Sequence, residues 1–209
     1  MFVLLYKNQI ITKSIIITGA GSGIGKSIAQ LAGERDFRVG VLDLDEEKAT
    51  EVASGIPNAI ALHASTTDPE KIEQALDKFG EVPDALVNNA SAISLTGTLE
   101  TPMKKFDLMF GINVRGTYAV SQACLPYLLK SNNPHILNIA SPINLNPKWF
   151  QEYTAYTIAK YGMSMCVIGM AEEFKNDGLA VNALWPKTII DTAALRLVPG
   201  VDSEASRDA

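Results

Sequence analysis

The chain has 209 residues, of which 47% are hydrophobic and 20% are charged, and its formal net charge is −5. This composition is typical of a folded globular protein, and the acidic balance argues against a nucleic acid partner, which usually requires a basic surface. No apolar run approaches the roughly 18 residues of a membrane span, and the two cysteines and two histidines are too isolated to form a metal site or a disulfide framework.

We expect a single domain over residues 1–209, because this length suits one α/β unit with a substantial core. Residues 1–13 are interpreted as an extension that leads into the first strand. Their apolar stretch is too short for a signal peptide, and no basic residues precede it. A soluble protein in a reducing compartment, the cytoplasm or an organelle matrix, is therefore expected.

Short runs rich in β-branched residues alternate with helical stretches along the chain. The runs predict strands over residues 14–18, 37–43, 58–62, 84–89, 135–140 and 179–185. Helices are predicted over residues 23–35, 45–53, 68–80, 104–129 and 153–175. In the third helix Asp68 is the expected cap, Pro69 lies in the first turn and Gly80 stops the helix. In the fourth helix, Pro126 is expected to end or bend the helix.

This alternation predicts a doubly wound parallel sheet, Rossmann-like, with helices on both faces in three αβα layers. The strands are apolar throughout, as strands buried on both faces are. Ligands of such sheets bind at the carboxyl ends of the strands. The glycine-rich loop at residues 18–27 follows the first strand, so it lies at that edge of the sheet, together with the ends of the fourth and fifth strands.

The loop TGAGSGIGKS resembles three phosphate-binding patterns. Residues 25–27 supply the second half of a P-loop, but Ala20 stands where its first glycine is required. The pattern G-x-G-x-x-G also fails, because Ile24 or Lys26 stands at its third glycine. The pattern that remains is G-x-x-x-G-x-G, met by Gly19, Gly23 and Gly25.

Glycines of this kind let the backbone approach a pyrophosphate at the N-terminus of the following helix. Asp43 ends the second strand, where a carboxylate hydrogen-bonds the ribose hydroxyls of an adenosine. The same carboxylate repels a 2′-phosphate, and neither Ser22 nor Leu44 supplies a compensating cation, so NAD(H) is the expected cofactor. Two alternatives stay open: a tight turn without a ligand, and a P-loop protein in which Asp43 binds magnesium.

Tyr156 and Lys160 lie four residues apart, on one face of the last helix, and Ser141 follows the fifth strand. A phenol with a pKa near 10 is a poor base at neutral pH. An adjacent ammonium favours the phenolate, and lowering the pKa by about 3 units requires only ~4 kcal/mol. The pair beside the expected cofactor cleft therefore indicates acid/base catalysis, whereas a solvated surface pair is the simpler alternative.

Five ordered motifs together resemble the short-chain dehydrogenase/reductase family. They are T-G-x-x-x-G-x-G, the segment Asn88-Asn89-Ala90, Asn113, Ser141, and Tyr156-x-x-x-Lys160. By this resemblance, Tyr156 exchanges a proton with the substrate oxygen, and Lys160 lowers the pKa of Tyr156 and holds the nicotinamide ribose. Ser141 hydrogen-bonds the carbonyl oxygen, and Asn113 holds a water that links Lys160 to solvent.

The loop, the acid and the resemblance together give the expected cofactor-binding set. It comprises Thr18, Gly19, Ser22, Gly23, Ile24, Gly25, Asp43, Asn88, Ala90, Tyr156, Lys160, Pro186 and Thr188, with Thr192 as the alternative to Thr188. No metal is expected. Within the family, residues 88–95, 145–150 and 156–165 resemble the hydroxysteroid dehydrogenase-like (type 2) subgroup. Ser65, Ser91, Pro142 and Lys187 depart from the usual family pattern.

The residues after the sixth strand show no further strand pattern. We therefore expect the family's seventh strand to be missing and the domain to be short at its C-terminus.

The resemblance also implies a homodimer or homotetramer that forms through the two long helices, residues 104–129 and 153–175. The second helix supports this expectation independently, because it is apolar almost all round.

The expected function is the NAD(H)-dependent interconversion of an alcohol and a carbonyl on a largely apolar small molecule. Six apolar residues are expected to face the cleft: Ile93, Leu95, Ile143, Leu145, Trp149 and Trp185. One alternative is a non-catalytic binding or scaffold protein with the same fold. A P-loop nucleotide hydrolase is less favoured, because the pair Tyr156 and Lys160 would then have no role.

Overall fold

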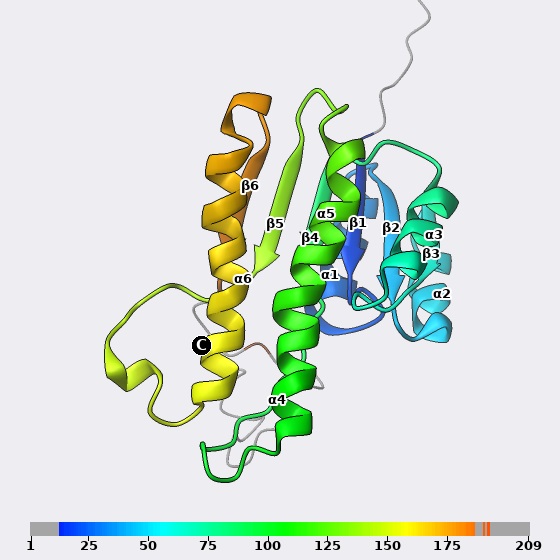
Figure 1. Cartoon of the computed structure of the whole chain (residues 1–209). Coiled ribbons are helices and arrows are strands. Elements are labelled where there is room, and N and C mark those ends of the chain that lie inside the picture. The colour runs from blue at the N-terminus through cyan, green and yellow to red at the C-terminus, as the bar shows by residue number, and fades with distance from the viewer. Residues whose placement is uncertain (1–12, 187–189, 191, 193–209) are drawn as a thin grey trace, which may run out of the picture.

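Six parallel strands form the centre of the protein, seen in a computed structural model that describes residues 13–186, 190 and 192 (Figure 1). Their order is β3-β2-β1-β4-β5-β6, so the strand order reverses between β1 and β4. The bounds are β1 Ser14–Thr18, β2 Arg38–Asp43, β3 Ala59–His63, β4 Ala85–Asn88, β5 His135–Ile139 and β6 Ala180–Leu184. The predicted doubly wound sheet is confirmed. The expectation about a seventh strand concerns residues 193–209, which lie outside the described residues.

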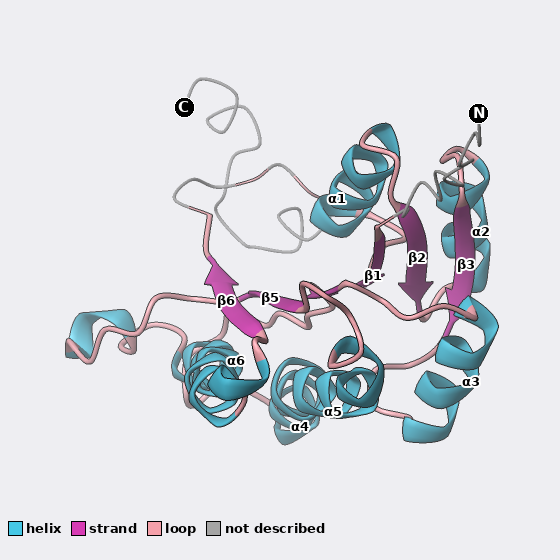
Figure 2. Ribbon diagram, turned by 90° about the horizontal axis from the view of Figure 1, so that it is seen from above, coloured by secondary structure: helices cyan, strands magenta, loops and turns pink. Residues whose placement is uncertain are grey.

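Helices cover both faces of the sheet (Figure 2). On one face lie α1 Gly23–Glu34 and α2 Glu46–Ser54; on the other lie α3 Pro69–Phe79, α4 Met103–Met109, α5 Thr117–Leu128 and α6 Thr154–Glu173. A π-helix, η1 Phe110–Gly116, joins α4 to α5, and two 3₁₀ turns occur at η2 Pro147–Trp149 and η3 Lys175–Asp177. The three-layer αβα arrangement therefore agrees with the prediction.

The sheet separates two hydrophobic clusters, as strict alternation along the strands requires. Ile16 packs on the α3 side with Leu86 and Ile136, whereas its neighbours Ile15 and Ile17 pack on the α1 side. Strands buried on both faces are the reason why these segments read as continuous apolar runs.

The local signals at α3 act as expected. The Asp68 carboxylate accepts a hydrogen bond from the Lys71 N–H, Pro69 opens the helix, and Gly80 ends it with a left-handed φ of 72°. Asp45 caps α2 in the same way, through the Lys48 N–H. These side chains satisfy N–H groups that a helix N-terminus leaves without partners.

Pro126, which is expected to end or bend the helix, lies in its final turn. Pro126 lies inside α5, which continues to Leu128. A proline in a final turn forgoes only one backbone bond, and buried Cys124 and Leu128 hold this turn against the core. The sequence also gave no indication of η1, whose wider turn interrupts the helical run at residues 110–116.

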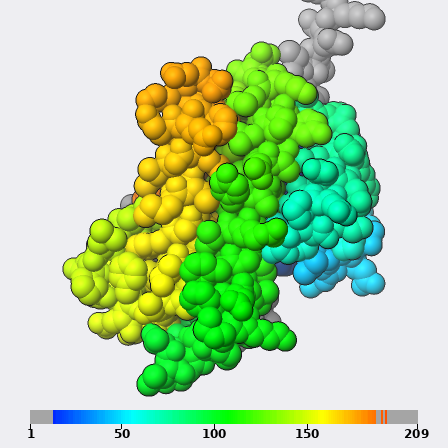
Figure 3. All heavy atoms as spheres, in the orientation of Figure 1, coloured from blue at the N-terminus to red at the C-terminus, as the bar shows by residue number. Residues whose placement is uncertain are grey.

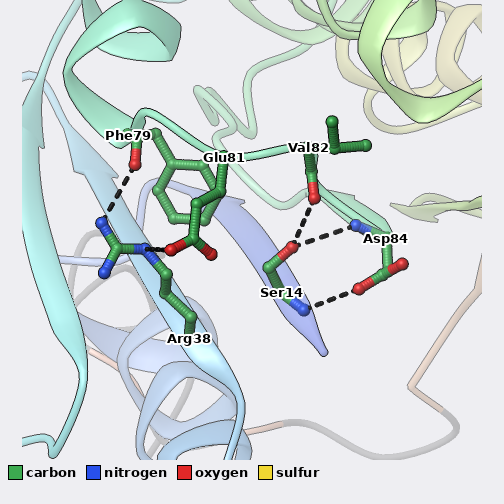
Figure 4. Close-up of polar contacts among 6 residues, drawn as sticks. All are labelled: Ser14, Arg38, Phe79, Glu81, Val82 and Asp84. Carbon is green, nitrogen blue, oxygen red and sulfur yellow. Dashed lines mark hydrogen bonds and ion pairs between the residues drawn. The ribbon is translucent and has the colours of Figure 1, made fainter. Parts of the chain in front are cut away.

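Side-chain bonds fix the edge of the sheet opposite to the carboxyl ends (Figure 4). The Ser14 hydroxyl donates to the Val82 carbonyl oxygen over 2.7 Å. Arg38 donates to the Phe79 carbonyl oxygen over 3.0 Å and pairs with Glu81 over 3.3 Å. The starts of β1 and β2 are thereby tied to the turn between α3 and β4, which leaves the opposite edge available for a site.

Candidate active site

A cavity of about 620 Å³ lies at the carboxyl ends of the strands. Segments from β1, β2, β4, β5 and α6 meet there, at the reversal of strand order where open α/β sheets bind ligands. Ten residues of the predicted site line it: Gly19, Ser22, Gly23, Ile24, Asp43, Ala90, Ser141, Tyr156, Lys160 and Pro186. The predicted catalytic and cofactor-binding side chains thus converge on one cavity.

Four other predicted residues lie in the supporting structure and do not line the cavity: Thr18, Gly25, Asn88 and Asn113. The Thr18 hydroxyl accepts hydrogen bonds from the Asn89 and Ala90 N–H groups, at 3.1 and 3.0 Å, and so ties β1 to the segment after β4. Thr188 lies outside the described residues, whereas its alternative, Thr192, lines the cavity.

The glycine loop depends on conformations and close contacts that favour glycine. Gly19 and Gly23 have left-handed φ angles of 63° and 54°. A Cβ on Gly25 would overlap the carbonyl oxygen of Gly19. No side chain caps α1, and its first turn holds no acidic residue, so its N-terminal N–H groups suit a phosphate. The loop therefore fits the pyrophosphate of a dinucleotide.

Asp43 also shapes this loop. Its carboxylate accepts hydrogen bonds from the N–H groups of Gly21, over 2.8 Å, and Asp45, over 3.0 Å. Lys48 packs against the same glycine, and its ammonium pairs with Asp45 over 2.8 Å. The hydrogen bond to Asp45 raises the pKa of Lys48 above its ordinary value, and the Asp43 charge adds to this effect. Sequence reasoning missed this cation, although Asp45 and Lys48 are spaced i,i+3.

The Lys160 ammonium contacts the end of β5 and a neighbouring methionine of α6. It donates to the Ile139 carbonyl oxygen over 2.7 Å and lies 3.5 Å from the Met163 sulfur. Burial lowers the pKa of Lys160 to about 8 and raises the pKa of Tyr156 above its ordinary value, since burial disfavours both charged forms. Lowering of the Tyr156 pKa by Lys160 stays a prediction, because here the ammonium is hydrogen-bonded to Ile139.

Asn113 acts as a clamp on the segment after β4. Its carboxamide accepts from the Ala92 N–H over 2.7 Å and donates to the Ala92 carbonyl oxygen over 2.9 Å. The side chain is fully buried and comes from η1. The π-helical turn thus directs an amide onto a backbone that borders the cavity, a placement often seen at functional sites.

Two asparagines that sequence reasoning left without a role support the site. The Asn89 amide donates to the carbonyl oxygens of Thr18, over 3.0 Å, and Gly19, over 3.1 Å, and Asn89 lines the cavity. Asn138 accepts from the Asn88 amide over 2.9 Å beneath the cavity. Their position in the sequence could have identified them, because both asparagines lie at the carboxyl end of a buried strand.

The apolar cleft residues divide into two groups. Ile93 and Trp185 line the cavity. Leu95, on the segment after β4, does not line it. Neither do Ile143, Leu145 and Trp149, which lie on the segment between β5 and α6 that projects from the body of the protein (Figures 1 and 2); Leu145 is 76% exposed. The expectation that these four residues face the cleft is wrong. The segment between β5 and α6 is instead tied to α6, where Tyr161 and Thr157 donate to the carbonyl oxygens of Asn144 and Trp149.

Over the described ranges, no group of three or more His, Cys, Asp or Glu side chains is arranged to hold a metal ion. Within residues 13–186, 190 and 192, we find no helix with the length and apolar character needed to cross a bilayer.

The fold and this arrangement define a class of α/β proteins that bind a dinucleotide at the carboxyl ends of a parallel sheet. Within that class the chain belongs to the short chain dehydrogenase family, whose model matches residues 13–198. This is a family of oxidoreductases that use a nicotinamide cofactor.

Curated relatives carry the name hydroxysteroid dehydrogenase-like protein 2. The chain is 53% identical to that of Danio rerio over 202 residues, with 90% of this chain and 48% of the relative covered. It is 48% identical to that of Homo sapiens over 211 residues, with 93% of this chain and 50% of the relative covered. The subgroup resemblance is confirmed, and the chain spans about half the length of these relatives.

Solved structures agree with this placement. A short chain dehydrogenase from Mycobacterium thermoresistibile is 40% identical with a TM-score of 0.81, covering 91% of this chain and 72% of its own. A 3-oxoacyl-[acyl-carrier protein] reductase from Brucella melitensis with bound NAD is 25% identical, with a TM-score of 0.76 and coverage of 87% and 72%. A metagenomic short-chain oxidoreductase in complex with NADP is 27% identical, with a TM-score of 0.75 and coverage of 84% and 82%.

Proposed function

We propose that the chain is an NAD(H)-dependent oxidoreductase that interconverts an alcohol and a carbonyl on a largely apolar substrate. One observation carries the proposal: Tyr156, Lys160 and Ser141 line the same cavity as the glycine loop and Asp43. A phenol, an ammonium and a hydroxyl beside a dinucleotide site are the groups that a carbonyl reduction requires.

The nicotinamide, when bound, supplies the hydride in reduction and takes it up in oxidation. In reduction, Tyr156 donates its proton to the oxygen of the carbonyl, and in oxidation its phenolate removes the proton of the alcohol. Ser141 donates a hydrogen bond to the same oxygen, where negative charge develops. The glycine loop and Asp43 hold the two ends of the cofactor's adenosine diphosphate moiety.

Lys160 acts by moving its charge. In the structure its ammonium is held by the Ile139 carbonyl oxygen. We propose that it leaves this carbonyl for the hydroxyls of the nicotinamide ribose, next to Tyr156. A cation at that position stabilises the phenolate and opposes the effect of burial on the Tyr156 pKa.

The preference for NAD(H) rests on Asp43. Its carboxylate lies on the cavity, where it would accept from ribose hydroxyls and repel a 2′-phosphate. Lys48 is a nearby cation, but Asp45 already pairs with it. The neighbours with bound NAD and NADP show that the fold accepts either cofactor, so the local charge decides.

An apolar substrate fits the apolar part of the cavity lining. Ile93, Ile112 and Trp185 line it alongside the proposed catalytic side chains. The printed name of the curated relatives refers to hydroxysteroids, which are apolar alcohols. We propose a substrate of this chemical class without assigning a particular compound.

We propose further that two copies associate through α5 and α6. These helices lie side by side on one face (Figure 3), and Tyr118, Met165 and Ile168 are exposed there. Met163 and Met170 instead pack inward and are buried. This division supports the proposal that α6 carries two apolar faces, one inner and one outer. A second copy of the chain would cover the outer face in a homodimer or homotetramer.

A nicotinamide-absorbance screen against a panel of apolar and small charged alcohols and carbonyls tests the function. We expect turnover with apolar substrates and a rise in melting temperature with NADH but not with ATP and magnesium. Stabilisation by ATP and magnesium alone would favour a nucleotide hydrolase. NADH binding without turnover of any substrate would favour a non-catalytic binding protein.

A further inference from the structure

Helix α6 holds the chain that leaves β5 at two points. The Lys160 ammonium donates to the Ile139 carbonyl oxygen over 2.7 Å, and the Ser164 hydroxyl donates to the Ser141 carbonyl oxygen over 2.5 Å. Both donors are buried, with Lys160 7% and Ser164 4% exposed. A buried polar side chain on a mostly apolar helix implies a specific partner, and here the partner is the backbone of the proposed catalytic serine.

The two bonds have matching spacings. Residues 139 and 141 are two apart in an extended chain, which is roughly 6.6 Å. Residues 160 and 164 are four apart in a helix, which is roughly 6 Å along its axis. Pro142 keeps Ser141 extended, and the Ala140 N–H bonds to the Leu184 carbonyl oxygen of β6 over 3.0 Å. The extended geometry of β5 therefore continues to Ser141.

Among the residues that the structure describes, the Ser164 hydroxyl is the donor to the Ser141 carbonyl oxygen. On one side of β5 the last residue of β4 is Asn88, opposite Asn138, so no strand continues beside Ser141 there. Ser164 also lies 3.4 Å from the Lys160 carbonyl oxygen, the usual internal partner of a helical serine, but its contact with Ser141 is much shorter.

We infer that Ser164 is a positioning residue that keeps Ser141 in register with Tyr156 during turnover. The inference rests on the proposed function, in which Lys160 leaves the Ile139 carbonyl for the nicotinamide ribose. The bond from Ser164 then holds the chain after β5 at the catalytic serine itself. Without it, the Ser141 hydroxyl would move relative to Tyr156, and small displacements of a reacting group lower turnover strongly.

Steady-state kinetics with Ser164→Ala provides the first test. We expect kcat to fall by about tenfold or more while KM for NADH stays within about twofold, because the cofactor contacts are unchanged. Ser164→Thr retains the hydroxyl and should recover most of kcat. Ser14→Ala is the matched control, because the Ser14 hydroxyl is also buried and donates to a backbone carbonyl, but at the opposite edge of the sheet.

Hydrogen exchange of the amides in residues 141–150 provides the second test and does not require activity. We expect faster exchange in Ser164→Ala than in the wild type, with a larger difference when NADH is bound. Tyr161→Phe, also on α6, is the comparison: it removes both hydrogen bonds with Asn144 and should speed exchange of the Asn144 amide, but it leaves the bond at Ser141 and should leave kcat unchanged. Should Ser164→Ala not fold, Ser164→Cys, a weaker donor of similar size, should show an intermediate loss of kcat.

Unchanged kcat and unchanged exchange in a folded Ser164→Ala or Ser164→Cys protein would overturn the inference. Inactivity of the wild type on every substrate would instead refute the proposed function. In that case the exchange measurement alone decides whether Ser164 anchors Ser141.

Discussion

The Lys160 ammonium hydrogen-bonds the Ile139 carbonyl oxygen at 2.7 Å, although Tyr156 lies one helical turn away on the same helix. A buried ammonium lowers its free energy by taking the nearest acceptor, and the end of β5 offers a carbonyl there. Burial still lowers its pKa to about 8. The Lys160 ammonium is thus a buried charge whose hydrogen-bond partner is a backbone carbonyl.

The buried Lys160 ammonium makes stability depend on pH. Its pKa falls from 10.5 to about 8 on folding, so between these values the unfolded chain binds more protons and stability rises with pH. We expect Lys160→Met to be more stable than the wild type below pH 8 by at most about 3 kcal/mol. The advantage should shrink between pH 8 and 10, as measured by denaturant unfolding without cofactor. A difference that is independent of pH would contradict this prediction, and Lys26→Met, at an exposed pair with Glu51, is the control.

Tyr156→Phe should abolish turnover and leave the affinity for NADH within a few-fold of the wild type. The change removes the proposed proton carrier and at most one of many cofactor contacts, because the glycine loop, Asp43 and Lys160 are unchanged. Kinetics and fluorescence titration measure the two quantities separately. If the variant kept most of its activity, the catalytic assignment of Tyr156 would be wrong.

Asp43→Asn should reduce the preference for NADH over NADPH by about tenfold or more, because the repulsion of the 2′-phosphate is removed. Asparagine still accepts one of the two backbone hydrogen bonds that shape the loop. Adding Lys48→Ala to this variant should weaken NADPH binding and leave NADH unaffected, since that cation lies near Asp43. Tighter binding of NADPH than NADH by the wild type would refute the assignment of Asp43.

Asn113→Ala should lower the free energy of unfolding by about 2–4 kcal/mol, because it leaves both backbone groups of Ala92 without partners. The exposed Asn146, which caps the η2 turn, provides a control, and its alanine variant should cost less. Denaturant unfolding measures both. Equal losses would mean that the clamp on Ala92 contributes little.

Ile168→Glu should convert an associated protein into a monomer, because it places a charge on the outer apolar face of α6. Leu31→Glu, on the exposed surface of α1, should leave the assembly unchanged. Light scattering at micromolar concentration measures the mass of each. A wild type that is already a monomer of 22.5 kDa would exclude this interface as a stable one.

Local sequence patterns determined most of the fold and part of the site. The strands were predictable because segments buried on both faces must be apolar. Helix α3 was predictable because Asp68 and Pro69 at its start and Gly80 at its end each act within one turn of a helix terminus. The glycine spacing, Asp43 and the Tyr156–Lys160 pair could be placed at one edge, since parallel strands bring their carboxyl ends together.

Only the tertiary structure decided where the polar side chains point. The Lys160 contact with Ile139, the Asn113 clamp on Ala92 and the Ser164 bond to Ser141 each join residues about 20 apart in sequence. A side chain's partner depends on which carbonyls and amides the packed strands and helices leave unsatisfied. No periodicity or short motif predicts that partner. For the same reason, the outward course of the segment that carries Leu145 and Trp149 could not be predicted from the sequence.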